Sequence, residues 1–244
     1  MYKEEIEYTC EGTKLYGTLY SPSKNEKKRP GILVVHAWRG KDDFTCEKAQ
    51  MLAELGYVGF SVDLYGKKTP ALSNEEAGQL MLPLWMNRAL LQERIKAAYS
   101  VLCQQPCVDA KRIGAIGFCF GGLTVIELLR SGADVRGIVS FHASFGNARD
   151  HVQAKTVPIA PHITGAALII HGHDDPLVSQ ADIAAMQSEL TVAGVDWQMH
   201  IHGHTAHAFT DPQAHAPEAG LMYQKKTCER ALKAMRNFFE EVLI

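Results

Sequence analysis

The chain has 244 residues, of which 46% are hydrophobic and 21% charged, and its formal net charge is −2 at pH 7. This composition is typical of a globular protein with a sizeable core, and the near-neutral charge favours neither nucleic acid nor an anionic membrane as a partner. No stretch approaches the roughly 18 apolar residues that span a bilayer, so we expect no membrane segment.

The N-terminal half opens with alternating polar and apolar residues, as expected of an antiparallel hairpin. Continuous apolar runs then indicate buried strands, separated by stretches of helical periodicity. In chain order we predict hairpin strands at 5–10 and 15–20, a strand at 31–36, a helix at 44–55, a strand at 57–62, and helices at 73–81 and 84–103. Pro83 is expected to separate the last two helices, because proline lacks the amide hydrogen that a helix uses.

The C-terminal half repeats short apolar strands and helices. In chain order we predict a strand at 112–117, a helix at 122–129, strands at 137–142 and 166–171, a helix at 179–193, a strand at 196–202 and a helix at 222–243. Ser179 is placed to cap one helix and Gly194 to end it. The alternation predicts an α/β fold with a mostly parallel sheet and an antiparallel N-terminal edge. Without a repeat or a break in composition, we expect residues 1–244 to form a single domain.

The segment Gly117-Phe118-Cys119-Phe120-Gly121 lies between a predicted strand and a predicted helix. Glycines two residues either side of a polar residue are typical of the nucleophile-elbow turn. Such a turn brings backbone against backbone, and it holds the central side chain at a helix N-terminus, where the dipole favours a thiolate. A small buried thiol in a glycine-rich turn is the structural alternative. We predict that Cys119 is a nucleophile.

A cysteine nucleophile needs a base and a third group that orients the base, and after an elbow these follow in the order acid, then histidine. Asp174 and Asp175 end a predicted strand, and we favour Asp175 because the proline after it biases its backbone toward an extended form. His207 lies deeper in its loop than His202 or His204 and precedes an apolar pair that can anchor the loop. We therefore predict His207 as the base.

Five segments share their spacing with one known family. They are the elbow at 117–122, Gly-x-x-Asp-Pro-x-Val at 172–178, Gly-x-x-x-His-Ala-Phe at 203–209, His-Ala-Trp-Arg-Gly at 36–40 and Asp-Leu-Tyr-Gly at 63–66. Together they resemble the dienelactone hydrolase (carboxymethylenebutenolidase-like) family, from about residue 15 to the C-terminal helix. The resemblance implies a three-layer α/β-hydrolase fold with helices on both faces of the sheet, and it implies Cys119 as nucleophile, His207 as general base and Asp175 as orienting acid. It also implies that the backbone amides of Phe120 and Trp38 form the oxyanion hole, and that neither a metal nor a cofactor is needed.

The sequence departs from this family where the substrate would bind. Ala37 stands where dienelactone hydrolases carry a glutamate that helps to activate the thiol. The family's two substrate-carboxylate arginines correspond to Lys67, which lacks the bidentate fork, and to Asp211, which would repel an anion. We therefore expect a neutral or less acidic small-molecule ester, lactone or thioester, hydrolysed through a thioester acyl-enzyme, with Lys67 and Arg39 as candidate substrate contacts. Without the glutamate, we expect Cys119 to rest as a thiolate paired with the catalytic imidazolium.

Two other classes of function stay open. A non-catalytic or redox-sensing protein would use Cys119 as a reactive thiol that is oxidised rather than acylated. A metal-binding protein would use several of the histidines in 171–207, since alternate strand positions share a face, although no compact set has recognisable ligand spacing. Cys103 and Cys107 are likewise expected to be inert thiols rather than a metal pair.

The six cysteines show no disulfide-framework spacing, which favours a reducing compartment. The first residues, Met1 to Glu5, lack the basic-then-apolar pattern of a signal peptide. We therefore expect a cytoplasmic protein. The sequence leaves open whether it is a monomer or a homodimer.

Overall fold

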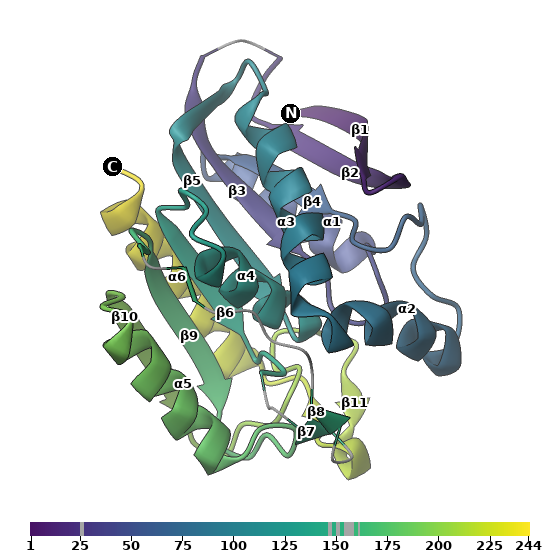
Figure 1. Cartoon of the computed structure of the whole chain (residues 1–244), viewed down its shortest axis with the longest axis vertical. Coiled ribbons are helices and arrows are strands. Elements are labelled where there is room, and N and C mark those ends of the chain that lie inside the picture. The colour runs from purple at the N-terminus through teal and green to yellow at the C-terminus, as the bar shows by residue number, and fades with distance from the viewer. Residues whose placement is uncertain (25–26, 146–147, 150–151, 154–158, 161) are drawn as a thin grey trace.

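The computed structural model describes residues 1–24, 27–145, 148–149, 152–153, 159–160 and 162–244, with the backbone alone for 148–149 and 152–153. Its framework is an eight-stranded sheet in the order β1-β2-β4-β3-β5-β6-β9-β10 (Figure 1). The strands of this sheet are β1 Tyr2–Cys10, β2 Thr13–Ser21, β3 Arg29–Val35, β4 Val58–Val62, β5 Val108–Phe118, β6 Gly137–Phe141, β9 Ala166–Gly172 and β10 Trp197–His202. The helices are α1 Asp43–Glu54, α2 Asn74–Met86, α3 Arg88–Cys103, α4 Phe120–Arg130, α5 Gln180–Val192 and α6 Lys225–Val242.

The strand directions follow the prediction. β2 pairs antiparallel with β1 and with β4, and the neighbours from β4 through β10 are parallel. Parallel neighbours need crossover connections, which the helices supply. The expected α/β sheet with an antiparallel N-terminal edge is confirmed. Because the parallel strands point the same way, the residues that follow β3, β5, β6, β9 and β10 all lie at the carboxyl ends of the strands, on one side of the molecule.

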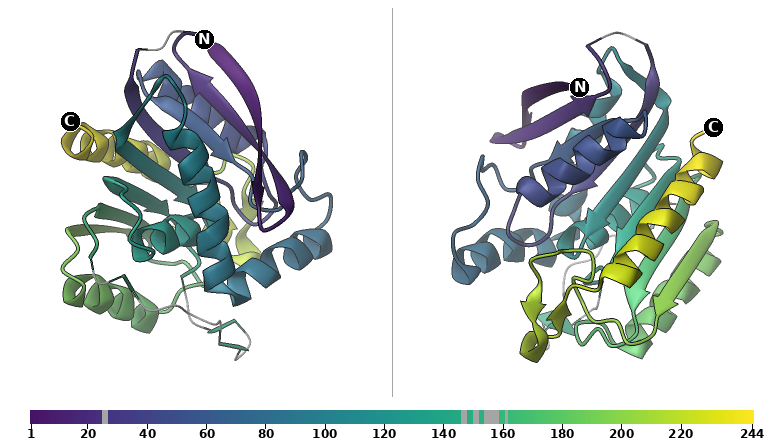
Figure 2. Two further views of the ribbon diagram at one scale, coloured as in Figure 1. Left: turned by 45° about the horizontal axis from the view of Figure 1, so that its top comes forward. Right: turned by 180° about the vertical axis from the view of Figure 1, so that it is seen from behind.

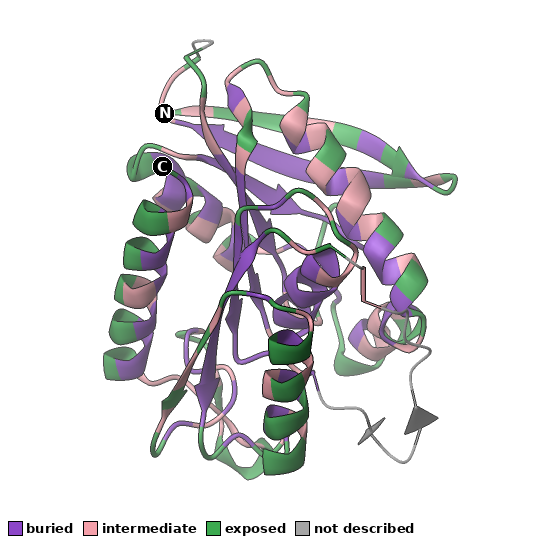
Figure 3. Ribbon diagram, turned by 60° about the vertical axis from the view of Figure 1, so that its left-hand side comes forward, coloured by how far each residue is buried: buried purple, intermediate pink, exposed green. Residues whose placement is uncertain are grey.

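Helices cover both faces of this sheet, giving three layers (Figure 2). On one face, Leu52 of α1 and Phe239 of α6 belong to the same apolar core as Ile32 of β3. On the other face, Ile95 of α3 and Leu123 of α4 belong to a second core. β4, β6 and β9 are buried along their whole length, while exposed residues lie on the outer sides of the helices (Figure 3). Within the described residues, no helix has both the length and the apolar character that crossing a bilayer requires.

Local caps explain where two of the helices begin and end. Ser179 accepts a hydrogen bond from the Asp182 amide, and the Asp182 side chain bonds back to the Ser179 amide, so the predicted cap is confirmed. Helix α5 ends just before Gly194, which has a φ of 69° that glycine adopts readily. Asp42 and Thr45 form the same reciprocal arrangement at the start of α1.

The prediction that Pro83 separates two helices is wrong. Pro83 lies inside α2, which continues to Met86, and the break falls at Asn87. Asn87 has an extended backbone, with a φ of −122° and a ψ of 90°, and its side chain accepts a hydrogen bond from Leu90 to begin α3. Proline removes a single amide donor, and near the end of a helix the loss of one hydrogen bond does not by itself terminate the helix. The capping side chain decides the boundary.

The C-terminal helix also begins later than predicted, at Lys225 rather than Met222. Leu221–Met222 forms β12 and pairs antiparallel with β11, which is His215–Ala216, across a short 3₁₀ turn at Pro217–Ala219. A second small pair joins β7, Ala148–Arg149, to β8, Val152–Gln153. Strands of two residues have no periodicity that a sequence can show, so neither pair was expected.

Candidate active site

Cys119 lies between the end of β5 and the start of α4, with a φ of 55° and a ψ of −113°. A positive φ is uncommon for a residue with a Cβ, and it occurs mainly where the surroundings impose it. An added Cβ at Gly117 would lie 2.0 Å from the Gly121 carbonyl oxygen, and one at Gly121 would lie 2.2 Å from the Val35 carbonyl oxygen. The two glycines therefore permit the tight turn, which presents the half-buried thiol at the N-terminus of α4.

His207 and Asp175 are brought together as the sequence predicts. Nδ1 of His207 donates a hydrogen bond to Oδ2 of Asp175 at 2.7 Å, and both side chains are buried. The other oxygen of Asp175 accepts from the Leu177 amide at 2.9 Å, which fixes the carboxylate. By contrast, Asp174 is exposed, and the nearest histidine to its carboxylate is the fully exposed His204 at 4.0 Å.

The small β11–β12 pair holds the histidine loop. The His207 amide donates to the Gly220 carbonyl at 2.9 Å, and the Met222 amide donates to the His207 carbonyl at 3.0 Å. Gly220 also packs against the ring of Pro176, only 2.2 Å from where a Cβ would stand. The segment that carries His207 is thereby held against the turn that carries Asp175.

Electrostatics couple Cys119 to His207. Burial would raise the pKa of the Cys119 thiol, but the charge of His207, helped by hydrogen bonds from Ser144 and the Phe120 amide, lowers it overall. Burial would lower the pKa of His207, but the charge of Cys119 and the bond to Asp175 raise it to about 10. Nε2 of His207 is buried and has no partner at strict hydrogen-bonding geometry among the described residues. A looser hydrogen bond between the His207 and Cys119 side chains nevertheless contributes to both pKa shifts, beside the attraction of their charges. Both directions favour a thiolate–imidazolium pair.

The two amides expected to form an oxyanion hole follow two neighbouring strands, β5 and β3. Phe120 is the first residue of α4, and Trp38 lies in the turn after β3. The close approach of Gly121 to the carbonyl oxygens of Val35 and His36 sets the start of α4 against the end of β3. Both amides therefore lie at the carboxyl ends of the parallel strands, as the thiol does.

A buried histidine shapes the turn that carries Trp38. Nε2 of His36 accepts a hydrogen bond from the Leu64 amide at 3.2 Å, which leaves the proton on Nδ1. Nδ1 donates to the Ala37 carbonyl at 2.6 Å. The Trp38 carbonyl accepts from the Tyr65 hydroxyl at 2.9 Å. These bonds fix the peptide unit that contains the Trp38 amide and the next peptide unit along the chain.

Ser144 and His142, which the sequence analysis did not single out, also lie beside Cys119 and His207. Oγ of Ser144 lies 3.6 Å from Sγ of Cys119. His142 has a φ of 37°, is buried, bonds through Nε2 to Thr210 at 2.7 Å, and its ring centre lies 5.1 Å from that of His207. Burial and the nearby His207 hold the pKa of His142 well below its usual value, so it is neutral. The sequence could have indicated these residues by their position, because 142–144 directly follow β6. In open α/β sheets, binding sites form at the carboxyl ends of the strands.

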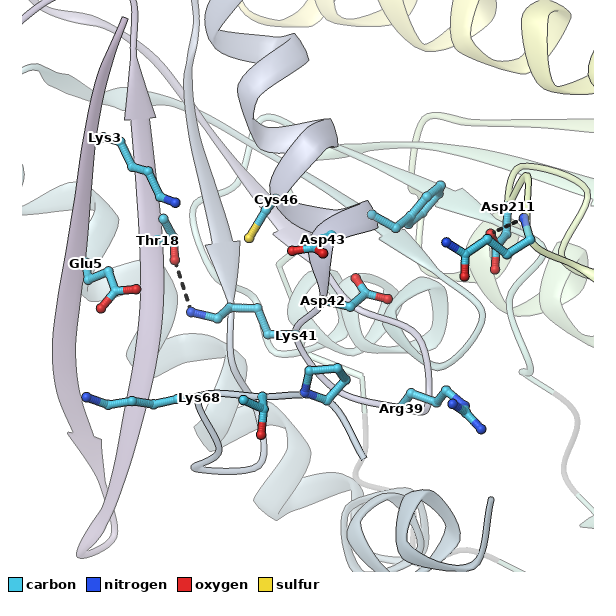
Figure 4. Close-up of a pocket in the computed structure, with 14 residues that line it drawn as sticks. Lys3, Glu5, Thr18, Arg39, Lys41, Asp42, Asp43, Cys46, Lys68 and Asp211 are labelled. Atoms are coloured by element: carbon cyan, nitrogen blue, oxygen red, sulfur yellow. Dashed lines mark hydrogen bonds between the residues drawn. The ribbon is translucent and has the colours of Figure 1, made fainter. Parts of the chain in front are cut away.

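The candidate substrate contacts are engaged elsewhere. Lys67 forms an ion pair with Glu76 of α2. Arg39 is exposed and donates to the Asn74 side chain at 2.7 Å. Arg39 also lines, with Asp211, a cavity of about 460 Å³ between the β1–β2 hairpin and the start of α1 (Figure 4). Among the described residues that line this cavity, none belongs to the predicted triad.

The cavity also contains a buried lysine. Lys41 is only 8% exposed and donates to the Thr18 hydroxyl at 3.0 Å (Figure 4). Burial lowers the pKa of its ammonium group. Over the described part of the chain, no three histidine, cysteine, aspartate or glutamate side chains gather as metal ligands would.

The strand order, with the elbow turn after β5, Asp175 after β9 and His207 after β10, matches the α/β-hydrolase fold. The model of the dienelactone hydrolase family matches residues 15–243, and the chain belongs to this family. It is therefore a hydrolase, and the family points to a small-molecule substrate.

Two solved structures and one curated relative illustrate the likeness. The structure named m3DLH is 39% identical, with a TM-score of 0.90 over 100% of this chain and 99% of its own. A dienelactone hydrolase-like promiscuous phosphotriesterase from metagenomic libraries is 32% identical, with a TM-score of 0.90 over the same shares. A probable 2-oxo-3-(5-oxofuran-2-ylidene)propanoate lactonase of a Bradyrhizobium species is 26% identical over 74% of this chain and 73% of its own length.

Proposed function

We propose that the protein hydrolyses an ester, lactone or thioester through Cys119, His207 and Asp175, by way of a thioester acyl-enzyme. The observation that carries this proposal is the buried His207–Asp175 hydrogen bond beside a thiol on a strained elbow. The lowered pKa of Cys119 and the raised pKa of His207 supply a thiolate without a further base.

Acylation begins when the Cys119 thiolate attacks the substrate carbonyl. The Phe120 and Trp38 amides hydrogen-bond to the resulting oxyanion, and each such donor typically contributes about 3 kcal/mol. His207, as the imidazolium, gives its proton to the leaving group. Neutral His207 then removes a proton from water, the water oxygen attacks the thioester, and the acid product leaves. Asp175 keeps the proton of His207 on Nδ1 throughout.

The surroundings favour a substrate without a carboxylate. Lys67 is neutralised by Glu76, and Asp211 places a negative charge in the loop after the catalytic histidine. The lactonase relative is named for a lactone that bears a propanoate group, so the survey should include lactones both with and without a carboxylate. The promiscuous phosphotriesterase relative adds phosphotriesters to the survey.

The test is a panel of p-nitrophenyl esters, thioesters, small lactones and phosphotriesters, run on the wild type and on Cys119→Ser and Cys119→Ala. We expect the wild type to turn over at least one ester, thioester or lactone of the panel. The rate of that turnover should fall by about 10³-fold or more in both variants, as for loss of a nucleophile. Intact mass after rapid quenching should show one acyl group on the wild type and none on Cys119→Ala.

Cys103→Ser is the matched control, because burial raises the pKa of that thiol and it lies at the end of α3. Its kinetics should equal those of the wild type. Hydrolysis that survives in Cys119→Ala would refute the mechanism. An absence of turnover across the whole panel, together with reversible oxidation of Cys119, would instead support a redox-sensing protein.

A further inference from the structure

The Cys119 thiol has a polar neighbour outside the predicted triad. Oγ of Ser144 lies 3.6 Å from Sγ, within the range of a hydrogen bond to sulfur. The Ser144 amide also donates to the Cys119 carbonyl at 3.3 Å, so the main chains of the two residues are joined as well. Ser144 follows β6, the strand beside β5 in the sheet. It is half-buried, as Cys119 is.

The chemistry of the two groups sets the direction of this contact. A thiolate has no proton and can only accept, whereas a serine hydroxyl can donate. Once Cys119 ionises, Ser144 must therefore be the donor. The side chain of Ala37, in the turn after β3, is a methyl group and cannot contribute a polar contact. A hydrogen bond to the charged form favours that form.

We propose that Ser144 is a further catalytic residue, whose hydroxyl donates a hydrogen bond to the Cys119 sulfur whenever that sulfur carries negative charge. This inference rests on the proposed thioester mechanism and adds a group to it. The bond acts in the resting enzyme, where it increases the thiolate population. It acts again in deacylation, where the sulfur is the leaving group.

Deacylation shows why the second role matters. The water oxygen attacks the thioester carbon and its proton passes to Nε2 of His207. The tetrahedral intermediate then collapses, the C–S bond breaks, and its electron pair returns to Sγ as a thiolate. The thioester sulfur is nearly neutral and a poor acceptor, whereas the departing sulfur is a strong one. The Ser144 hydrogen bond is therefore stronger in the transition state than in the acyl-enzyme, which is the condition for accelerating a step.

The first test follows alkylation of Cys119 by iodoacetamide against pH, read by mass spectrometry of the peptide that contains it. In the wild type the rate should rise with a midpoint below the ordinary thiol value of about 8.5. In Ser144→Ala the midpoint should move up by about one pH unit, because the hydrogen bond that favours the charged form of the sulfur is lost. Below both midpoints the rate should fall about tenfold. Ser144→Thr keeps the hydroxyl and should restore the wild-type profile.

The second test separates acylation from deacylation by rapid-quench mass spectrometry at a pH above both midpoints. Ser144→Ala should slow deacylation more than acylation, so the acyl-enzyme should accumulate. Ser131→Ala is the matched control, because that hydroxyl bonds to the Leu128 carbonyl at the far end of α4. It should leave both readouts unchanged. If Ser144→Ala does not fold, Ser144→Gly removes the same hydroxyl and is measured in its place.

The outcomes distinguish this proposal from the one on which it rests. If Cys119→Ala is inactive but the hydroxyl-deleted variant has the wild-type pH midpoint and no added acyl-enzyme, the Ser144 role is refuted and the thioester mechanism stands. If Cys119→Ala still hydrolyses the substrate, the mechanism itself fails. A shifted midpoint with accumulation, both reversed by Ser144→Thr, supports the proposal.

Discussion

The half-buried Cys119 thiol differs electrostatically from three other buried or half-buried thiols of the chain. Burial raises the pKa of Cys10, Cys103 and Cys228, and no neighbour reverses that effect. At Cys119 the same burial is outweighed by His207 and by hydrogen bonds, and the pKa falls. The pKa of a cysteine in this chain is therefore raised or lowered according to its neighbours, and only the lowered value favours a reactive thiolate.

Asp175 is expected to act by holding His207 in one tautomer. In Asp175→Asn the side-chain oxygen can still accept from the Leu177 amide, but the amide nitrogen then faces Nδ1 of His207. That arrangement favours the wrong tautomer and removes a charge that raises the pKa of His207. We expect kcat to fall by about 10³–10⁴-fold with the fold intact, as measured by steady-state kinetics and circular dichroism.

Asp174→Asn is a matched control for this variant, because Asp174 is adjacent in sequence, exposed, and not bonded to His207. Its kcat should lie within about twofold of the wild type, as for an ordinary surface substitution. Equal effects of the two substitutions would contradict the assignment of Asp175.

At the scale of elements, the site depends on the turn from β5 into α4. The turn is tight enough that Gly117 and Gly121 approach backbone oxygens, and Cys119 takes a positive φ between them. The carbonyl of Cys119 is then bonded to Leu123 inside the helix and to Ser144 on the next strand's loop. A small change in the geometry of this turn would displace the Cys119 sulfur from both His207 and Ser144.

Gly121→Ala tests the turn. Its Cβ would lie 2.2 Å from the Val35 carbonyl oxygen, and backbone cannot move aside easily. We expect a loss of about 1–3 kcal/mol in unfolding free energy, as for overpacking, and a loss of esterase activity larger than the stability change explains. Denaturant titration and steady-state kinetics give the two values.

Gly78→Ala is the control, since its Cβ would meet nothing within 4 Å and it lies within α2. Alanine should stabilise that helix by about 0.5–1 kcal/mol. If Gly121→Ala is as harmless as Gly78→Ala, then the elbow is less constrained than its contacts indicate.

At the scale of the whole molecule, a buried charge network joins three helices on one face of the sheet. Glu127 of α4 contacts Arg130 at 2.7 Å, Gln92 of α3 at 2.9 Å and Arg88 at 3.8 Å. Arg130 also pairs with Glu189 of α5 at 2.6 Å. Burial lowers the pKa of Arg88 to about 10, and the charge of Glu127 opposes that effect.

Glu127→Gln should destabilise the protein by about 3–5 kcal/mol, because it leaves Arg88 buried without a compensating charge. The measurement is chemical unfolding followed by far-ultraviolet circular dichroism and by tryptophan fluorescence. Glu93→Gln is the control, since it breaks an exposed pair with Lys96 and should change stability by less than about 1 kcal/mol. A loss below about 1 kcal/mol in Glu127→Gln would mean that Arg88 finds another partner.

The same unfolding curves bear on domain organisation. The two apolar cores lie on opposite faces of one sheet and share its strands. We propose that residues 1–244 unfold as one unit, so the two optical probes should give coincident transitions.

The sequence by itself determined the order of the helices and of the strands of the main sheet, the antiparallel edge and the elbow around Cys119. These features are local, because apolar periodicity, a capping serine and closely spaced glycines each act within a few residues. The sequence also predicted an acid and then a histidine, each following an apolar strand, and it favoured Asp175 over its neighbour through the proline that follows. The structure places Asp175, and not Asp174, against His207.

The tertiary structure alone decided what surrounds the sulfur and where the charged side chains are used. Ser144 and His142 approach Cys119 and His207 because β6 lies beside β5 in the sheet, which no spacing in the chain specifies. The fold pairs Lys67, a candidate substrate contact, with Glu76. Pro83 remained inside a helix because a cap at Asn87 fixed the boundary. Each of these outcomes depends on which segments the packing of the sheet brings together, and that is a property of the whole chain.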